Sequence, residues 1–404
     1  MRFTTLSAAV ALTARVSSAP VTQTNATQAA FVDIPAGYMK GFKNPSVQSS
    51  VGGKAVCISG TVDVTASANN VHINHPGFTN QIEVTEFLDE AFQVNSTLLE
   101  RFIGGRNHVS GSYGIYSQLC FPHGMVNATT IQFLIHGGGF DRSYWNAAPG
   151  YSYVDYAAEQ GYMTFLYDRL GTGLSDHPDP LQTVQWGLQV EVAHELITLL
   201  RTGSLAGLTF KHVVGVGHSL GSFQTNGVTT QHPDDLDAAV LTGFSPDTSG
   251  SSIALAGVDL TIAAQNQPFR FSELPGSYLT SNSIGGTQYY FFRAPGFDPA
   301  MLRFAEATKQ TVTFAELFTS AATVSSNFTG PIDVVNGEND LPNCHGNCLV
   351  PYNKAAEAKE AYYPAASNGS SWYLSSESGH GLNFHYSASA AYEHIHNFIK
   401  ANGF

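Results

Sequence analysis

A serine between two glycines constrains this chain more than any other feature of its sequence. Gly217-His218-Ser219-Leu220-Gly221 follows an apolar run, residues 211–216, that predicts a buried strand, and it precedes a segment of helical composition. Glycine is needed at 217 and 221 where a sharp turn leaves no room for a Cβ atom. The pattern is typical of a nucleophile elbow, whose following helix directs its first N–H groups at a bound anion. A glycine-bounded turn with a bystander serine is the alternative for these five residues alone.

A second glycine-rich segment, His136-Gly137-Gly138-Gly139-Phe140, follows the apolar run Thr130 to Ile135. Such a loop can bring backbone N–H groups close to a bound oxygen, and we interpret it as half of an oxyanion hole, with His136 anchoring the loop. A flexible turn at the end of a strand is the alternative.

Strands and helices alternate through most of the chain, which predicts an α/β fold with a mostly parallel central sheet flanked by helices. Leu188, Val192 and Leu196 recur at helical spacing within 184–202. The alternation stops at 247–326, an aromatic-rich segment that we interpret as a helical lid. The expected strands are 113–121, 130–135, 161–167, 211–216, 238–244, 330–336 and 372–374, and the expected helices of the core are 184–202, 352–362 and 387–400.

We therefore expect a signal peptide over 1–19 and one domain over 20–404. Within it, 20–112 is an N-terminal extension with the first strands, 113–246 the first half of the core, 247–326 the lid and 327–404 the second half. The extension has a strand-like stretch, 54–64, and a helix-like stretch, 83–102, but no evident chemistry, so we expect it to pack on the core.

Ser219, Asp340 and His380 each follow a predicted strand. In a parallel sheet the carboxyl ends of the strands lie at one edge, where such side chains can meet. A serine hydroxyl needs a base such as imidazole, and a buried carboxylate fixes the imidazole tautomer. The sequence therefore predicts a catalytic triad, in the chain order serine, acid, histidine.

Each partner of the serine has competitors nearby in the chain. Asp333 lies inside a predicted strand and Glu338 in the turn that follows, so Asp340 is the preferred acid. His385 competes with His380, which the flanking glycines favour. The Asp168 to Ser175 loop is interpreted as structural, pinned by hydrogen bonds and an ion pair of its Asp and Arg residues.

Composition limits the class of partner. The 404 residues are 43% hydrophobic and 12% charged, as in globular proteins, and the net charge is −13 without a lysine or arginine cluster. Nucleic acids and anionic membranes are therefore unlikely partners. The acidic charge together with the aromatic lid favours a neutral, fairly apolar small molecule as substrate. No apolar stretch beyond the N-terminus is long enough to span a bilayer.

The first nineteen residues resemble a secretory signal peptide, although a transit peptide for an organelle is an alternative. Four cysteines allow three pairings, of which we prefer Cys57–Cys120 with Cys344–Cys348, because the latter two share one short loop. Export would also agree with five glycosylation sequons, at Asn25, Asn95, Asn127, Asn327 and Asn368.

Together these motifs resemble the α/β-hydrolase superfamily, in the branch of epoxide hydrolases, dehalogenases, haloperoxidase-like esterases and hydroxynitrile lyases. The resemblance covers about 113–404 except the lid, and the long N-terminal part with Cys57 and Cys120 looks like a secreted fungal subgroup. It implies Ser219 as nucleophile, His380 as base and then acid, Asp340 as its orienting carboxylate, and an oxyanion hole of N–H groups from Leu220 and from Gly138 or Gly139.

Epoxide hydrolases and dehalogenases of this branch use an aspartate nucleophile, so Ser219 argues against both. The resemblance implies no cofactor and no metal; Cys344-His345-Gly346-Asn347-Cys348 offers three possible ligands without an apparent fourth. The expectation is a secreted serine esterase for an ester, thioester or lactone. The alternatives are other reactions of the same triad, a lipase recruited to lipid, and a binding protein on a hydrolase fold.

Overall fold

The computed structural model describes residues 35–124 and 129–404, which belong to one compact unit. The expected signal peptide and the sequons at Asn25 and Asn127 lie outside the described residues.

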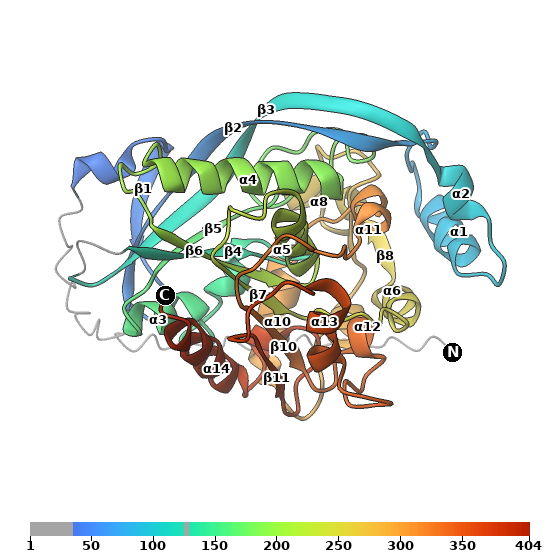
Figure 1. Ribbon diagram of the computed structural model, residues 1–404. Helices are drawn as coiled ribbons and strands as arrows, with labels where there is room; N and C mark the ends of the chain where they lie inside the picture. Colours follow the sequence, from blue (N-terminus) through green and yellow to red (C-terminus); the bar gives the residue numbers. More distant parts are fainter. Residues whose placement is uncertain (1–34, 125–128) are drawn as a thin grey trace, which may run out of the picture. The chain divides into compact units, whose positions relative to one another are not determined.

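A nine-stranded sheet forms the centre of this unit, in the order β1-β2-β3-β5-β4-β6-β7-β10-β11 (Figure 1). The strands from β5 to β11 run parallel, whereas β1, β2 and β3 pair antiparallel, as β3 does with β5. The expected mostly parallel sheet is confirmed. The strands are β1 Lys43–Ser49, β2 Ala55–Ile73, β3 Ile103–Pro122, β4 Thr130–Ile135, β5 Met163–Tyr167, β6 His212–His218, β7 Ala238–Thr242, β10 Ile332–Gly337 and β11 Ser371–Ser375.

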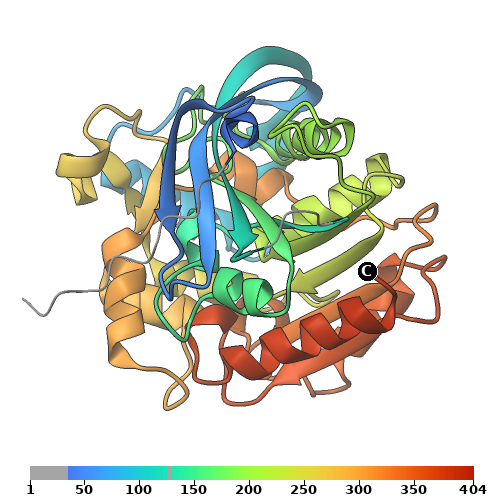
Figure 2. The same cartoon turned by 90° about the vertical axis from the view of Figure 1, so that its left-hand side faces the viewer.

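Helices cover both faces of the sheet, as Figure 2 shows from the side. One hydrophobic core joins the sheet to α4 (Trp186–Thr202), α5 (Leu220–Gln231) and α13 (Lys354–Tyr362). A second core lies on the other face, against α3 (Tyr153–Glu159) and α14 (Ala388–Ala401). The strands between the two cores are apolar on both faces, as parallel strands buried between helices are.

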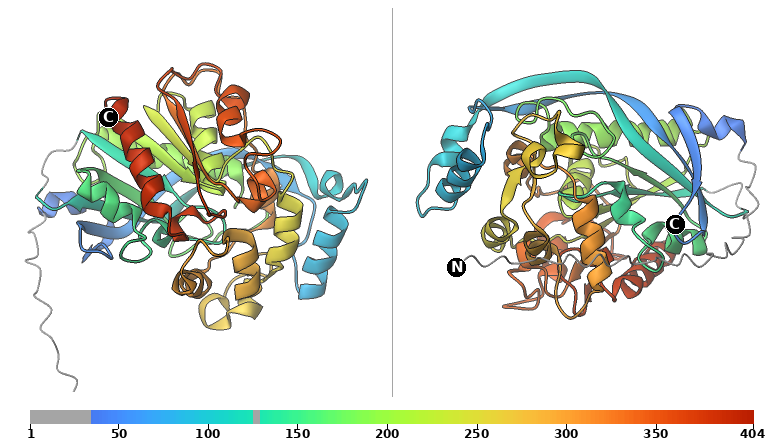
Figure 3. Two further views of the ribbon diagram at one scale, coloured as in Figure 1. Left: turned by 90° about the horizontal axis from the view of Figure 1, so that it is seen from below. Right: turned by 180° about the vertical axis from the view of Figure 1, so that it is seen from behind.

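The N-terminal part differs from the expectation. The stretch 83–102 forms two helices, α1 (Gln81–Ala91) and α2 (Leu98–Phe102), after a short 3-10 helix η1 (Ala36–Met39) and the first strands. These two helices connect the far ends of β2 and β3, two long strands that pair from Ala55 with Pro122 to Ile73 with Ile103. We call α1, α2, the loop between them and the far half of this hairpin the arm; it reaches past the edge of the core, beside the lid (Figures 1 and 3).

The lid contains helices and a small two-stranded sheet, β8 with β9. Its last helix covers Phe314–Thr319. The elements are α6 Ser251–Val258, β8 Leu260–Ile262, α7 Ala263–Asn266, α8 Pro268–Phe271, β9 Leu279–Ser281, α9 Ile284–Phe291, α10 Pro299–Thr308 and α11 Phe314–Thr319.

A third hydrophobic core joins the arm to the lid, through residues such as Phe87 and Phe314, whose rings stack 4.7 Å apart. The extension therefore does not simply pack on the core: β1 and β2 extend the central sheet, and α1 and α2 support the lid. Figure 3 shows α1 and α2 next to the lid helices in both views.

Two disulfide bonds, Cys57–Cys120 and Cys344–Cys348, are present, as preferred from the sequence. The first joins paired residues of β2 and β3, and the second closes a short loop after β10. None of the helices in the described residues is both long and apolar enough to cross a bilayer.

Candidate active site

Ser219 lies in the turn between β6 and α5. Its φ of 53° and ψ of −119° are unusual for a residue other than glycine. A Cβ atom on Gly217 would lie 2.5 Å from the carbonyl oxygen of Gly221, and one on Gly221 would overlap the carbonyl oxygen of Ile135. The N–H of Ser219 donates to the carbonyl of Thr242, at 2.9 Å, which fixes the turn to β7. The two glycines therefore permit a strained turn with the serine at its tip.

The three side chains proposed for the triad meet at the carboxyl ends of their strands. Ser219 Oγ lies 2.8 Å from His380 Nε2, and His380 Nδ1 lies 2.7 Å from Asp340 Oδ2. The His380 and Asp340 side chains are fully buried. The imidazole thus has a hydroxyl at one nitrogen and a carboxylate at the other, which is the arrangement required for a base of fixed tautomer.

The loop after β10 holds Asp340. This residue caps the short helix α12 (Leu341–Cys344), because Asp340 Oδ1 accepts a hydrogen bond of 2.9 Å from the N–H of Asn343. Its other oxygen faces His380, so both carboxylate oxygens are engaged. The Cys344–Cys348 disulfide closes the same loop and excludes these cysteines as metal ligands.

The competing acids have other partners. Asp333 Oδ1 accepts hydrogen bonds from Ser371 Oγ and His394 Nε2, at 2.7 and 3.0 Å. Glu338 is bonded through its backbone: its N–H donates to the carbonyl of Ser375, and its carbonyl accepts from the N–H of Cys348, each at 2.9 Å. Of the acidic residues that the structure describes, Asp340 is the one bonded to His380.

The competing base, His385, holds the loop that carries His380. Its Nε2 accepts hydrogen bonds from the N–H groups of Gly379 and Arg293, each at 3.0 Å, and its Nδ1 donates to the carbonyl of Gly381. Burial lowers the pKa of His385 to about 4, so it stays neutral and structural at physiological pH. This loop ends in the 3-10 helix η3 (Leu382–Phe384).

His218, next to Ser219, is buried and neutral. Its Nδ1 donates to Thr242 Oγ1 at 3.0 Å, and its ring stacks on Tyr144 of the 3-10 helix η2 (Arg142–Trp145), with centroids 4.4 Å apart. Burial, and next the neighbouring His380, lower its pKa well below the usual value. His218 therefore fills the space beneath the triad without adding charge.

Two backbone segments lie beside the serine. Leu220 is the first residue of α5, so its N–H has no partner within the helix. Gly138 and Gly139 line the cavity beside Ser219, and Gly139 has a φ of 74°. A Cβ on Gly137 would lie 3.0 Å from the Cβ of Ser219, so this glycine permits the loop to approach the elbow. The segments can hold an anionic oxygen between them.

His136 anchors this loop from below, as expected. Its Nδ1 donates to the carbonyl of Gly137 at 2.8 Å, and its Nε2 accepts from the N–H of Arg169 at 3.0 Å. Burial lowers its pKa well below the usual value, with a further contribution from Arg169.

The Asp168 to Ser175 loop corrects the sequence analysis in one respect: its Asp and Arg do not pair with each other. Asp168 forms an ion pair with Arg142, at 2.6 Å, and Arg169 forms a fully buried ion pair with Glu316 of α11. The second pair fastens the lid to the core. Burial raises the pKa of Asp168 to about 6, in spite of Arg142.

The lid segment between α10 and α11 is bonded to the loop 136–141, which we call the oxyanion loop. The N–H of Gln310 donates to the carbonyl of Gly139 at 2.9 Å, and its side-chain amide donates to Asp141 Oδ2 at 2.6 Å. Thr311 Oγ1 donates to the carbonyl of Gly171 at 2.5 Å. The lid therefore supports the loop that faces Ser219.

A cavity of about 440 Å³ opens at Ser219. Its wall is mostly apolar and draws on the elbow, the oxyanion loop and the lid. One wall residue, Phe92, comes from the arm, for which the sequence indicated no chemistry. Its local sequence does not mark it as a site residue, because only the packing of the arm against the lid brings it to the cavity. The apolar residues of the wall include Phe92, Phe140, Leu220, Phe223, Leu255, Val258, Leu260, Tyr290, Phe291, Val312, Leu317 and Phe318.

Comparison with known proteins agrees with this architecture. The model of the Alpha/beta hydrolase family (Abhydrolase_6) matches residues 133–385, more than half of the chain. The chain belongs to the Alpha/beta hydrolase family. A search of curated proteins found no similar sequence.

Similar solved structures include two from Mycobacterium tuberculosis. Rv0554 superposes with a TM-score of 0.50 at 14% identity, covering 74% of this chain and 96% of that one. The putative non-heme bromoperoxidase BpoC of strain H37Rv superposes with a TM-score of 0.50 at 16% identity, covering 72% and 97%. Identities this low establish the shared fold.

Proposed function

We propose that this protein is a serine hydrolase that cleaves a carboxylic ester, thioester or lactone through an acyl-enzyme. The observation that carries the proposal is the hydrogen-bonded chain from Ser219 through His380 to Asp340 in a buried site. The serine is thereby provided with a base, and the base with an orienting carboxylate.

In this mechanism Ser219 Oγ attacks the carbonyl carbon while His380 Nε2 takes the hydroxyl proton. The N–H groups of Leu220 and of Gly138 or Gly139 stabilise the negative oxygen of the tetrahedral intermediate. His380 then protonates the leaving alcohol, thiol or ring oxygen, and an acyl-enzyme remains on Ser219. Water, deprotonated by His380, hydrolyses that acyl-enzyme by the same steps in reverse order.

The cavity favours a neutral substrate with an apolar acyl group. The charged residue in its wall, Lys309, is already compensated: its ammonium group donates to Glu306 Oε1 at 2.7 Å and to the carbonyl of Ser281 at 2.8 Å. The rest of the wall is uncharged and mostly aromatic or aliphatic, with a few hydroxyl and amide side chains, so it buries apolar groups without requiring a counter-charge.

The test is labelling with a fluorophosphonate, which phosphonylates an activated serine, followed by intact-mass analysis. We expect one adduct on the wild-type protein and none on Ser219→Ala or His380→Ala. Ser219→Ala should lower esterase turnover by roughly three to six orders of magnitude, since the nucleophile is removed while the fold is kept. Ser252→Ala, at another serine of the cavity wall, is the matched control and should label normally.

An adduct that persists on folded Ser219→Ala would contradict the assignment. Other reactions of the same triad, such as carbon–carbon cleavage, lyase chemistry, acyl transfer or peptide cleavage, would also label Ser219, and analysis of products separates them from ester hydrolysis. Absence of labelling on folded wild type would favour a binding protein.

We also propose that the protein is secreted and belongs to a fungal subgroup of such hydrolases. The two disulfides and the exposed sequons at Asn95, Asn327 and Asn368 support export. Detection of the glycosylated chain in culture medium tests this proposal.

A further inference from the structure

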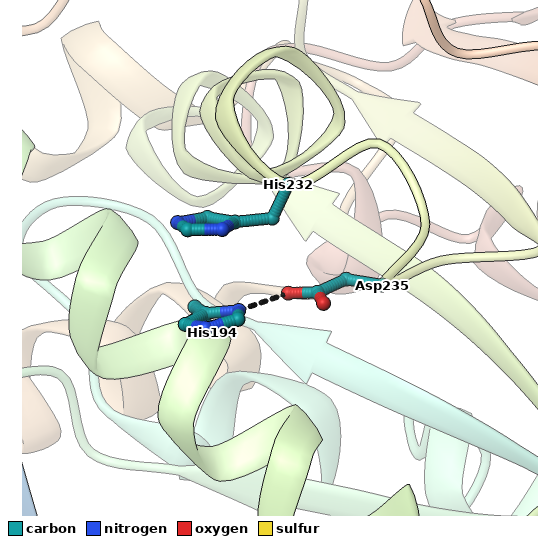
Figure 4. A group of neighbouring side chains, drawn as sticks. All are labelled: His194, His232 and Asp235. Atoms are coloured by element: carbon teal, nitrogen blue, oxygen red, sulfur yellow. Dashed lines mark hydrogen bonds and ion pairs between the residues drawn. The ribbon is translucent and has the colours of Figure 1, made fainter.

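Two histidines and an aspartate lie close together at the end of α5 that is remote from Ser219. His194 comes from the middle of α4, His232 caps the C-terminus of α5, and Asp235 follows three residues later (Figure 4). Because Ser219 is at the N-terminal end of the 12-residue helix α5, about 18 Å of helix separates this cluster from the nucleophile. The proposed reaction makes no use of it.

The backbone of the cluster is held in place. The N–H of Asp235 donates to the carbonyl of His232 at 3.0 Å. Arg201 of α4 donates through Nε and Nη2 to the carbonyl of Asp235, at 2.9 and 2.7 Å. The three side chains therefore leave fixed positions on two packed helices and on the loop between α5 and β7.

The possible ligand atoms already converge. His194 Nδ1 lies 2.7 Å from Asp235 Oδ2, and the rings of His194 and His232 stack 3.7 Å apart at 9° (Figure 4). One ligand atom of each residue lies within 4.8 Å of the others. Around a tetrahedral Zn²⁺ with bonds of 2.0–2.2 Å, ligand atoms lie about 3.4 Å apart. Because the two rings are nearly parallel, their in-plane lone pairs do not yet point at one ion, and binding requires the His232 ring, which is 23% exposed, to rotate out of the stack.

The charges around the cluster favour a cation. Each histidine of the cluster has a carboxylate beside it: Asp235 beside His194, and Glu191, whose Oε1 lies 3.2 Å from His232 Nε2. The neighbouring cation, Arg201, is engaged by Asp237 Oδ2 at 2.7 Å as well as by the carbonyl of Asp235.

We propose that His194, His232 and Asp235 form a binding site for a divalent transition metal, with Zn²⁺ as the ion that best matches two imidazoles and a carboxylate. The ion takes the place of the proton between His194 and Asp235, and Glu191 lies within reach of the fourth position. Such an ion would join α4 to the C-terminal end of α5.

The test is titration of ZnCl₂ into the full-length, chelator-treated protein at pH 7.5, followed by calorimetry and by thermal unfolding. We expect one ion per chain with a micromolar Kd, and a rise in Tm of roughly 3 °C at a hundredfold excess over Kd. His194→Gln and His232→Gln should each weaken binding at least tenfold. His212→Gln, which alters a similar half-buried histidine beside Asp237, is the matched control and should bind normally.

Circular dichroism shows whether each variant is folded, and Asp235→Asn replaces any histidine variant that is not. Binding that is weaker than millimolar, or binding that both folded histidine variants retain, overturns the proposal. In that case the stacked histidines only fasten two helices by hydrogen bonds. Since the site is remote from Ser219, failure here leaves the fluorophosphonate result unaffected.

Discussion

His218 and His380 lie side by side, with ring centroids 5.0 Å apart, but their partners differ. His380 has a carboxylate at Nδ1 and a hydroxyl at Nε2, whereas His218 has a threonine hydroxyl at Nδ1 and no hydrogen-bond partner at Nε2 among the described residues. The same side chain therefore has the partners of a base at one position and those of a neutral packing residue at the other.

Buried histidines also govern the expected stability of the protein in acid. His396 donates from Nδ1 to the carbonyl of Tyr392 and accepts at Nε2 from Gln132, and burial lowers its pKa to about 4. Unfolding restores the ordinary pKa near 6.5, so the unfolded chain takes up a proton between pH 6.5 and 4. The contribution of His396 to stability is present above this range and is lost as the pH falls through it.

We predict that His396→Gln reduces the loss of unfolding free energy between pH 7 and pH 4 by roughly 3 kcal/mol. Urea unfolding at several pH values measures this effect. His72→Gln, at an exposed position on β2, is the control and should leave the pH dependence unchanged. An unaltered pH dependence in His396→Gln would show that this histidine titrates alike in both states.

The elbow glycines allow a second prediction at this scale. Gly221→Ala should prevent correct folding or lower the unfolding free energy by several kcal/mol, because its methyl group would overlap the carbonyl oxygen of Ile135. Gly105→Ala is the control, since nothing lies within 4 Å of its added Cβ. Soluble yield and thermal unfolding of the two variants make the comparison. Equal stability would mean that the turn relaxes to accommodate the methyl group.

At the scale of elements, the sequence predicts the buried strands well. The run 130–135 has the same bounds as β4, and 161–167 differs from β5 by two residues at its start. Strands buried on both faces give uninterrupted apolar runs, which need no knowledge of distant contacts. By contrast, β2 continues to Ile73 through Ala66-Ser67-Ala68-Asn69-Asn70, where its length depends on pairing with β3.

The two disulfides should affect different properties. Cys57–Cys120 closes a loop of 63 residues and Cys344–Cys348 a loop of 4. On the chain-entropy account, replacing both cysteines of the first pair with alanine costs about 4 kcal/mol of unfolding free energy, and of the second about 2 kcal/mol. Because the second pair closes the Asp340 loop, its loss should also lower kcat. Denaturant unfolding and ester hydrolysis measure the two effects; equal losses of kcat would contradict this division.

At the scale of the whole molecule, the site draws on parts of the chain that local patterns cannot connect. Ser219, Asp340 and His380 could be proposed from the sequence because each follows its own strand. The partners of Asp168 and Arg169 could not, since they are 26 and 147 residues away in the chain. The same holds for Phe92 in the cavity wall and for His194 with Asp235, which come together only when the elements pack.

The contribution of the arm to the cavity leads to a prediction about substrate preference. Phe92→Ala should lower kcat/KM for a medium-chain ester roughly tenfold and leave that for an acetate ester unchanged, because the lost ring belongs to the apolar wall. Val94→Ala, at a 91% exposed position of the same arm, is the control. Equal losses for both esters would indicate that the arm acts on the triad and not on the acyl chain.

The bonds between Gln310 and the oxyanion loop limit how this enzyme could be recombined with its relatives. A chimera that exchanges residues 247–308 keeps the bonds from Gln310 to Gly139 and Asp141 and from Thr311 to Gly171. A chimera that exchanges residues 247–312 also replaces Gln310 and Thr311. Its new residues must form the same bonds, or the lid is no longer bonded to the oxyanion loop. The natural crossover point for exchanging specificity therefore lies before Lys309.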